Sequence, residues 1–336
     1  MVGYLIRRIV AGISVLFMVT VATFTIFFLG PADPAAALCG SRNCSPERYM
    51  AIKRSLGLDQ PKVEQFFSFL GGIFAGRTLQ SGGFVKECPA PCFGYSFIQN
   101  RPVSVILAEN LPVTVSIALG ASVIMLTVGV LIGSYAAINR GTTIDKALVA
   151  MSLTLSSLPY YVLALLAFLV LAVQLQIFPR TGYHPLLGDG PFFLDLLKWV
   201  QGLLLAWLVL GLVMSTSYAR FSRASMIEAL GEDFVRTARA KGLSPRRVQF
   251  RHALRAALAP VVTIFGLDLA GLMGGTIFTE RIFNLKGIGY MAVDAVFNLD
   301  LPIIMGTVLF ASIVIVAMNI IVDVAYSLID PRVRLG

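Results

Sequence analysis

Six long apolar segments dominate the pattern of hydrophobic and polar positions along the chain. Each is close to or above the roughly 20 residues that a helix needs to cross the hydrocarbon core of a bilayer. Because lipid offers no hydrogen-bond partners, a spanning segment has to satisfy its backbone groups internally, as a helix does. We therefore predict transmembrane helices over residues 9–30, 111–139, 147–179, 199–218, 256–279 and 301–322.

Composition supports a membrane protein over a soluble one. Of the 336 residues, 57% are hydrophobic and only 13% are charged, whereas soluble domains carry about a quarter charged residues. A β-barrel would show short alternating segments instead of long apolar ones. The first apolar segment follows Arg7 and Arg8 and is longer than the roughly 7–15 residues of a cleaved signal. The fold class predicted is an all-α integral membrane protein with six transmembrane helices, the first of them retained.

The net charge of +9 indicates membrane orientation rather than a nucleic-acid partner, which we do not expect. Basic residues gather in cytoplasmic loops of membrane proteins. Basic pairs lie before the first apolar segment and after the last, at Arg332 and Arg334. The loop between the fourth and fifth segments carries nine more basic residues: Arg220, Arg223, Arg236, Arg239, Lys241, Arg246, Arg247, Arg251 and Arg255. With six spans, both termini and this loop lie on the same side, which we assign to the cytoplasm.

All four cysteines lie in the long segment between the first two spans, which the same topology puts outside the cytoplasm. An even number of cysteines confined to an oxidising compartment indicates two disulfides. A four-thiolate zinc site is the alternative, because the spacing within each pair is loosely compatible with zinc ligands. The residues concerned are Cys39, Cys44, Cys88 and Cys92.

Four parts follow from this pattern. Residues 1–30 form the N-terminal segment and first helix, 31–108 an extracytoplasmic domain, and 331–336 a cytoplasmic tail. Residues 109–330 form a five-helix core that contains the cytoplasmic loop 219–256. Within the external domain, Ser45 and Pro46 are typical of a helix start.

Prolines and small residues refine the predicted spans. Pro112 and Pro302 lie where a proline is tolerated in the first turn of a span, whereas Pro159 lies inside the third apolar segment and predicts a kink. Two pairs of glycines four residues apart, at 129 and 133 and at 271 and 275, allow close contact between helices.

No catalytic constellation is present in the sequence. The dipeptide Gly-Lys never occurs, which excludes the usual phosphate-binding loop. His184 and His252 fall on opposite sides of the membrane in the predicted topology and therefore cannot share a site. We expect neither an enzyme nor a cofactor bound by this chain.

The cytoplasmic loop has a pattern of its own. Glu232 and Asp233 precede a basic segment that ends near Lys241, which suits the helix dipole at both ends. An apolar residue recurs every four positions at Leu230, Phe234 and Ala238, which predicts one buried stripe. Gly242 then favours a left-handed helix end, and Ser244 with Pro245 favours the start of a second helix. The pattern predicts a helical hairpin; an ordinary basic loop that sets topology is the alternative.

This segment resembles the coupling loop of ABC-importer permeases. The match covers residues 233–242 and continues through His252 to Pro260, and the form Thr-Ala-Arg-Ala-Lys-Gly at 237–242 resembles the peptide and nickel permease branch. In that family a short helix inserts into a groove of an ATPase. The resemblance assigns ATPase coupling to seven residues: Arg236, Thr237, Ala238, Arg239, Lys241, Gly242 and Leu243. The family motif begins with glutamate, whereas Arg236 stands here, so the role of that glutamate does not carry over.

Shorter stretches elsewhere resemble the same branch. They lie at residues 4–8, 30–34, 274–280, 287–289, 294–295 and 330–332. The resemblance implies a type I importer core, a second homologous permease, two ATPases that bind ATP and magnesium, and an extracytoplasmic substrate-binding protein. Di- or oligopeptides are the implied substrate; nickel or another small solute is the alternative within the family. A stand-alone secondary transporter is the alternative from another class.

Asp268 is the one charged residue inside the predicted spans. Such residues are costly in lipid and usually face a cavity or a partner. One interpretation assigns Asp268 to the translocation pathway, where it meets the ammonium group of a peptide. The other makes it a hydrogen-bonding group between helices. Glu280 and Arg281, at the end of the same apolar segment, are interpreted as residues of the membrane boundary; contact with a substrate-binding protein is the alternative.

Overall fold

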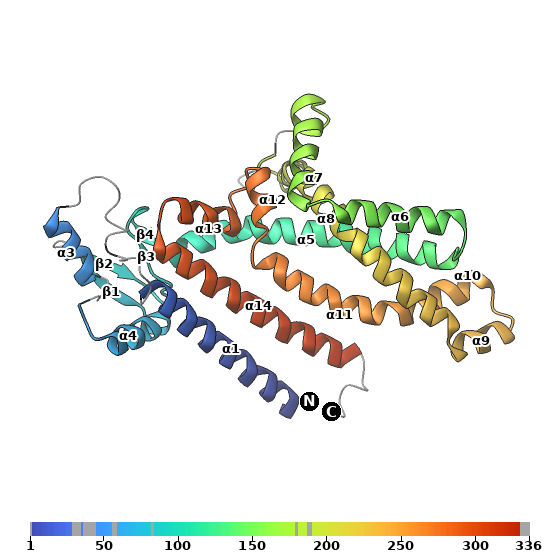
Figure 1. Cartoon of the computed structure of the whole chain (residues 1–336), viewed down its shortest axis with the longest axis horizontal. Helices are drawn as coiled ribbons and strands as arrows, with labels where there is room; N and C mark the ends of the chain where they lie inside the picture. The colour runs from blue at the N-terminus through green and yellow to red at the C-terminus, as the bar shows by residue number, and fades with distance from the viewer. Residues whose placement is uncertain are drawn as a thin grey trace. The chain divides into compact units, whose positions relative to one another are not determined.

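The computed structural model describes residues 2–28, 35, 45–55, 59–81, 84–178, 181–186 and 190–329 (Figure 1). The chain forms two compact units. The first combines residues Met1–Pro112 with Met273–Ile277 and Lys286–Gly336. The second combines Val113–Leu272 with Phe278–Leu285.

Five helices of the described chain are long and apolar enough to cross a membrane. A sixth span follows if two helices joined at a 94° bend count as one. The bent pair is α6 (Thr143–Ser157) with α7 (Tyr160–Ala167) and its π-helical continuation η1 (Phe168–Gln174). The other five are α1 (Val2–Phe28), α5 (Val103–Ile138), α8 (Phe192–Gly231), α11 (Leu254–Met273) and α14 (Leu301–Ile329). Each predicted span therefore corresponds to a helix or to the bent pair.

Of the three proline predictions, two are confirmed and one needs correction. The third apolar segment does bend at Pro159, by 94°, and α6 ends and α7 begins there because Leu158 and Pro159 both have extended backbone angles. Pro112 lies inside α5, which begins at Val103 rather than at residue 111. The earlier turns of α5 bury apolar residues such as Ile106, which offsets the backbone bond that Pro112 cannot make. The third prediction is confirmed, because Pro302 lies in the first turn of α14.

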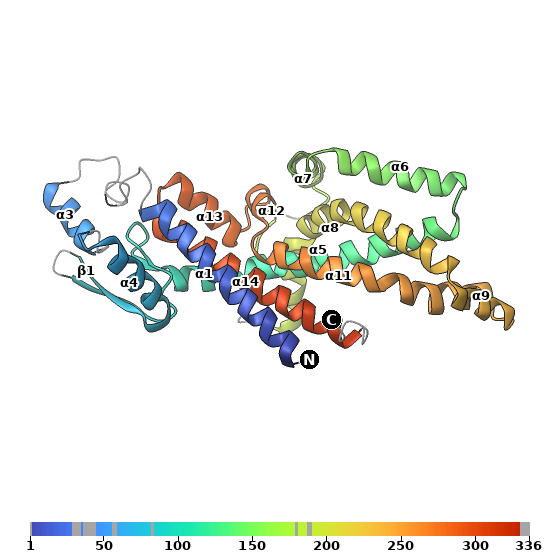
Figure 2. The ribbon, with the colours of Figure 1, turned by 60° about the horizontal axis from the view of Figure 1, so that its bottom comes forward.

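The first unit is built on α1 and α14, which lie side by side in Figures 1 and 2. An ion pair joins them, with Arg8 Nε 3.1 Å from Asp323. The unit also contains α3 (Pro46–Ser55), α4 (Lys62–Ala75) and α13 (Ile288–Phe297). The helix start at Ser45 and Pro46 is thus confirmed by α3.

Two small antiparallel sheets belong to the same unit and were not predicted from the sequence. Strand β1 (Arg77–Ser81) pairs with β2 (Phe84–Cys88) in a register that joins Arg77 to Cys88. Strand β3 (Tyr95–Ser96) pairs with β4 (Arg101–Pro102). These strands are too short to give a period-two pattern that stands out from a loop.

The second unit packs α5 closely against α8. A side chain at Gly133 would come within 2.3 Å of the Ala219 carbonyl, and one at Gly129 within 2.5 Å of Tyr218 Cβ. The first predicted glycine pair therefore does allow close contact. At Gly271 a side chain would meet nothing within 4 Å, so in this chain Gly271 serves no such contact.

Helix α8 continues well past the predicted span. The sequence placed residues 219–231 in a loop, but they are helical to Gly231. Ala219, Ser222, Met226 and Ala229 recur every three or four positions and are buried. Their spacing is helical, and the polar residues between them hid it from a hydropathy pattern.

Cys88 and Cys92 form a disulfide. Cys39 and Cys44 lie outside the described residues, as does the tail 331–336. Half of the cysteine prediction is therefore confirmed, and the other half stays a prediction.

We predict that all four cysteines are oxidised in the folded protein, because all four fall in the segment 31–108. Mass spectrometry after alkylation without reduction should find no alkylated thiol. Four alkylated thiols together with stoichiometric zinc would contradict this and establish the four-thiolate site instead.

Candidate functional site

The segment that follows α8 is a helical hairpin. It consists of α9 (Asp233–Ala240), a turn, α10 (Pro245–Arg247) and the π-helix η2 (Val248–Ala253), which leads directly into α11. Two long helices, α8 and α11, therefore enter and leave the hairpin without an intervening loop (Figure 1). The predicted hairpin is confirmed.

Glu232 separates α8 from α9. Its extended backbone, with φ −67° and ψ 152°, ends one helix and begins the next. The Glu232 carbonyl accepts from the N–H of Val235 at 3.0 Å, and Asp233 in the first turn suits the helix dipole. The ion pair between Asp233 and Arg236 is almost fully exposed, so it adds little stability.

The end of α9 is a Schellman turn built on Gly242. The N–H of Leu243 donates to the Ala238 carbonyl at 3.3 Å, and the N–H of Gly242 donates to the Arg239 carbonyl at 2.9 Å. This pair of bonds defines the motif and requires a left-handed residue between the two helices. Gly242 supplies it with φ +75°. The left-handed prediction is thus confirmed.

Ser244 differs from its prediction. It precedes Pro245 with an extended backbone, as a capping residue does, but its side chain makes no capping hydrogen bond. The carbonyl of Ser244 accepts from the N–H of Val248 at 3.1 Å. Proline at the first helical position, rather than a side-chain cap, therefore begins α10.

A buried apolar cluster holds the hairpin in place; we call it the hairpin core. Its residues come from the ends of α5 and α8, from α9, and from η2 and the start of α11. They are Ala137, Met226, Ala229, Val235, Ala238, Val248, Ala253 and Ala257, with Leu243 packed against them. Small side chains dominate, so the helices can approach closely.

The apolar stripe predicted on α9 is partly wrong. Ala238 is buried, but Phe234 is 43% exposed and its neighbour Val235 is buried in its place. The helix is turned so that Phe234 points away from the hairpin core. Exposed together with Phe234 are Arg236, Thr237, Arg239, Lys241 and Gly242; we call this set the α9 surface.

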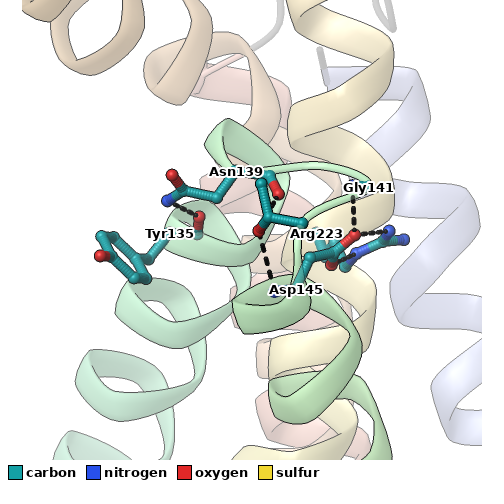
Figure 3. A network of polar contacts seen from close by, with 6 residues as sticks. Tyr135, Asn139, Gly141, Asp145 and Arg223 are labelled. Carbon is teal, nitrogen blue, oxygen red and sulfur yellow. Dashed lines mark hydrogen bonds and ion pairs between the residues drawn. The ribbon is translucent and has the colours of Figure 1, made fainter.

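An ion pair between a buried carboxylate and a partly exposed arginine lies one helical turn from the hairpin core. The guanidinium of Arg223, on α8, donates two hydrogen bonds to the carboxylate of Asp145, from Nε at 2.6 Å and from Nη2 at 2.8 Å (Figure 3). The same carboxylate accepts from the N–H of Gly141 at 3.0 Å. Asp145 is only 3% exposed. The pair fixes the start of α6 on α8.

Hydrogen bonds of the Thr142 side chain hold the turn before α6, and this turn positions Asp145 for its contact with Arg223. Thr142 accepts from the N–H of Asp145 at 3.4 Å and donates to the Asn139 carbonyl at 2.7 Å. Asn139 in turn donates to the Tyr135 carbonyl at 2.9 Å (Figure 3). Sequence reasoning missed Asp145 and treated Arg223 as one of many basic residues. The spacing Thr-x-x-Asp at 142–145, close to a capping box, was the signal that marked it.

Asp268 lies beside a small cavity. The hydroxyl of Tyr218 donates to Asp268 Oδ2 at 2.7 Å, which joins α8 to α11. Asp268 is exposed in this chain, whereas Tyr218 is buried. The cavity measures about 50 Å³ and is lined by Ser217, Tyr218, Phe221, Val261, Ile264 and Asp268. Asp268 thus makes the hydrogen bond between helices that one interpretation predicted. Its carboxylate also stays accessible to a ligand or a partner, as the other interpretation requires.

Glu280 is buried inside the protein, so its contacts are with neighbouring helices; its predicted place at the membrane boundary stays a prediction. It belongs to the short helix α12 (Ile277–Ile282) and is completely buried. Its carboxylate accepts from Thr114 at 2.9 Å. Next to it, Thr279 and Tyr160 share a hydrogen bond of 2.7 Å. These bonds join α12 to α5 and α7 within the second unit.

Comparison with known proteins places this geometry in a family. The family described as binding-protein-dependent transport system inner membrane component matches residues 129–335, and the N-terminal component of such systems matches residues 1–118. A peptide transport system permease protein of Brucella abortus (strain 2308) is 37% identical over 334 residues, which cover 99% of each chain. The dipeptide transport system permease protein of Escherichia coli (strain K12) is 31% identical over 355 residues, with 99% coverage of each.

A solved structure shares the fold. The MetNI methionine ABC transporter in inward-facing conformations aligns with a TM-score of 0.52 at 17% identity, and the alignment covers 68% of this chain and 97% of that one. The long apolar helices, the hairpin between α8 and α11 and the family matches over almost the whole sequence lead to one assignment. The chain belongs to the inner membrane component family of binding-protein-dependent ABC importers, as a multi-pass permease with a type I importer fold.

Proposed function

We propose that this chain is the permease subunit through which an ATP-driven importer passes di- or oligopeptides. The α9 surface carries the coupling part of this proposal, because it is an exposed helix face held rigidly by the hairpin core. The substrate part is supported by relatives that are named as peptide and dipeptide permeases. Those names favour peptides over nickel and an importer subunit over a stand-alone secondary transporter.

Partner subunits complete the importer in this proposal. A second, homologous permease shares the translocation pathway, and an extracytoplasmic binding protein delivers the substrate. Two ATPase subunits bind ATP and magnesium, so this chain holds no cofactor and hydrolyses nothing itself. The basic bias of the hairpin and of both termini supports a cytoplasmic position for all three.

The hairpin transmits ATPase closure in four steps. ATP binding closes the ATPase pair around the α9 surface and displaces α9. The hairpin core moves with α9, because its small side chains leave little room for independent motion. Since α8 and α11 continue directly from the hairpin, both spans tilt together. The pathway then changes from inward-facing to outward-facing and accepts the substrate.

Asp268 belongs to the translocation pathway in this proposal. Asp268 lines the small cavity between α8 and α11 and is exposed in this chain. Its carboxylate is therefore available to the ammonium group of a peptide. The Tyr218 hydroxyl holds the carboxylate in one orientation.

Gly242→Val should abolish peptide-stimulated ATP hydrolysis while the protein still inserts in the membrane. Nothing lies within 4 Å of a side chain at this position, so the damage is backbone strain alone. A left-handed conformation costs a residue with a Cβ about 1–2 kcal/mol, and a β-branched residue fits it worse. The measurement is ATP hydrolysis and peptide uptake by the reconstituted importer.

Gly231→Val is the matched control. Gly231 also has open space around its Cβ position, but its backbone is not left-handed. This variant should couple nearly normally. Uptake at the wild-type rate by Gly242→Val would overturn the coupling role of the turn.

Two substitutions separate the charge of Asp268 from its hydrogen bond. Asp268→Asn keeps an acceptor for Tyr218 but removes the charge, and Tyr218→Phe removes the bond but keeps the charge. If the carboxylate meets a peptide ammonium, Asp268→Asn should lower uptake strongly and Tyr218→Phe only mildly. A larger loss from Tyr218→Phe would assign Asp268 to helix packing.

A further inference from the structure

Helix α4 exposes a stripe of large apolar side chains. Val63 is 67% exposed, Phe67 62% and Phe74 79%. Their spacing of four and seven residues puts them on one face of the helix. Large apolar side chains exposed along one face of a helix indicate a surface that lipid or another protein covers in the membrane.

The adjoining face of α4 packs against the transmembrane helix α1. The ring of Phe66 lies 6.3 Å from that of Phe17 and 5.3 Å from that of Phe24. The ring of Phe69 lies 6.2 Å from those of Phe24 and Phe28. Figure 2 shows α4 beside the end of α1.

These contacts give the depth of α4 relative to the membrane. Phe28 is the last residue of α1, and the spanning part is Ile6–Phe28. At 1.5 Å per residue, Phe24 and Phe17 lie roughly 6 and 16 Å from the end of the helix. Since the hydrocarbon core is about 30 Å thick, Phe66 contacts α1 at the level of the acyl chains rather than beyond the membrane.

The charges of α4 agree with this depth. Lys62 and Glu64 are its only charged residues, and both lie in its first turn. Lys62 Nζ donates to the carbonyl of Phe28 at 3.3 Å, so this charge lies at the end of the span. A helix whose charged residues all lie at one end, with uncharged residues over the rest of its length, is suited to the boundary between headgroups and acyl chains.

We propose that α4 lies in one leaflet of the bilayer, with Val63, Phe67 and Phe74 in contact with lipid acyl chains. The segment 31–108 is then not a domain free in solution, since α4 anchors it to the membrane surface beside α1. Lipid is favoured over a protein partner because the stripe is continuous with the span. Phe17, which touches Phe66, is itself 49% exposed on α1.

Fluorescence quenching by brominated lipid tests the proposal. Phe67→Trp and Phe74→Trp each add one indole to the two native tryptophans, Trp199 and Trp207. The whole importer is reconstituted in nanodiscs of phosphatidylcholine with either plain or dibrominated acyl chains. Glu87→Trp, at an exposed position of β2, is the matched control in the same unit.

The two α4 variants should lose the emission of the added tryptophan in brominated nanodiscs, whereas Glu87→Trp should keep it. Equal emission of all three in both lipids would overturn the proposal. If, in that case, the emission of the α4 variants changes on addition of the binding protein, the stripe contacts that protein instead. Peptide uptake by the same preparations is measured separately, because the position of α4 does not depend on what the importer carries.

Discussion

The packing of α9 into the hairpin core is the constraint on which the rest of the coupling region depends. With 8 residues, α9 is far too short to be a stable helix alone in water. Its conformation therefore comes from burying Val235 and Ala238 against the ends of α8 and α5. The same burial decides which side chains stay outside, and so it creates the α9 surface.

Two further contacts make this packing a rigid unit. The Schellman turn at Gly242 returns the chain toward α11, so that Leu243 and Val248 enter the hairpin core. One turn along α8, Arg223 and Asp145 fix α6 to the same helix. Asp145 is buried while Arg223 is partly exposed, so desolvation offsets part of the attraction, and the two-point contact of the guanidinium fixes the geometry.

The sequence was sufficient for the features that repeat a strong local pattern. Apolar length predicts the spans, and a glycine between helical segments predicts the turn at Gly242. It was insufficient wherever tertiary packing decides between faces. Both Phe234 and Val235 are apolar, and only contact with α8 determines that Val235 is buried. Asp145 was missed because its partner lies far along the chain. The burial of Glu280 was not predicted because it depends on contact with α5.

The central claim is that the α9 surface contacts an ATPase subunit. It is tested most directly by a photoreactive phenylalanine analogue at position 234 in the purified, transporting importer. The comparison is the same analogue at Phe297, an exposed phenylalanine between the fifth and sixth spans. Illumination should cross-link position 234 to the ATPase, whereas position 297 should capture no ATPase. A transporting complex in which position 234 captures no ATPase would contradict the account.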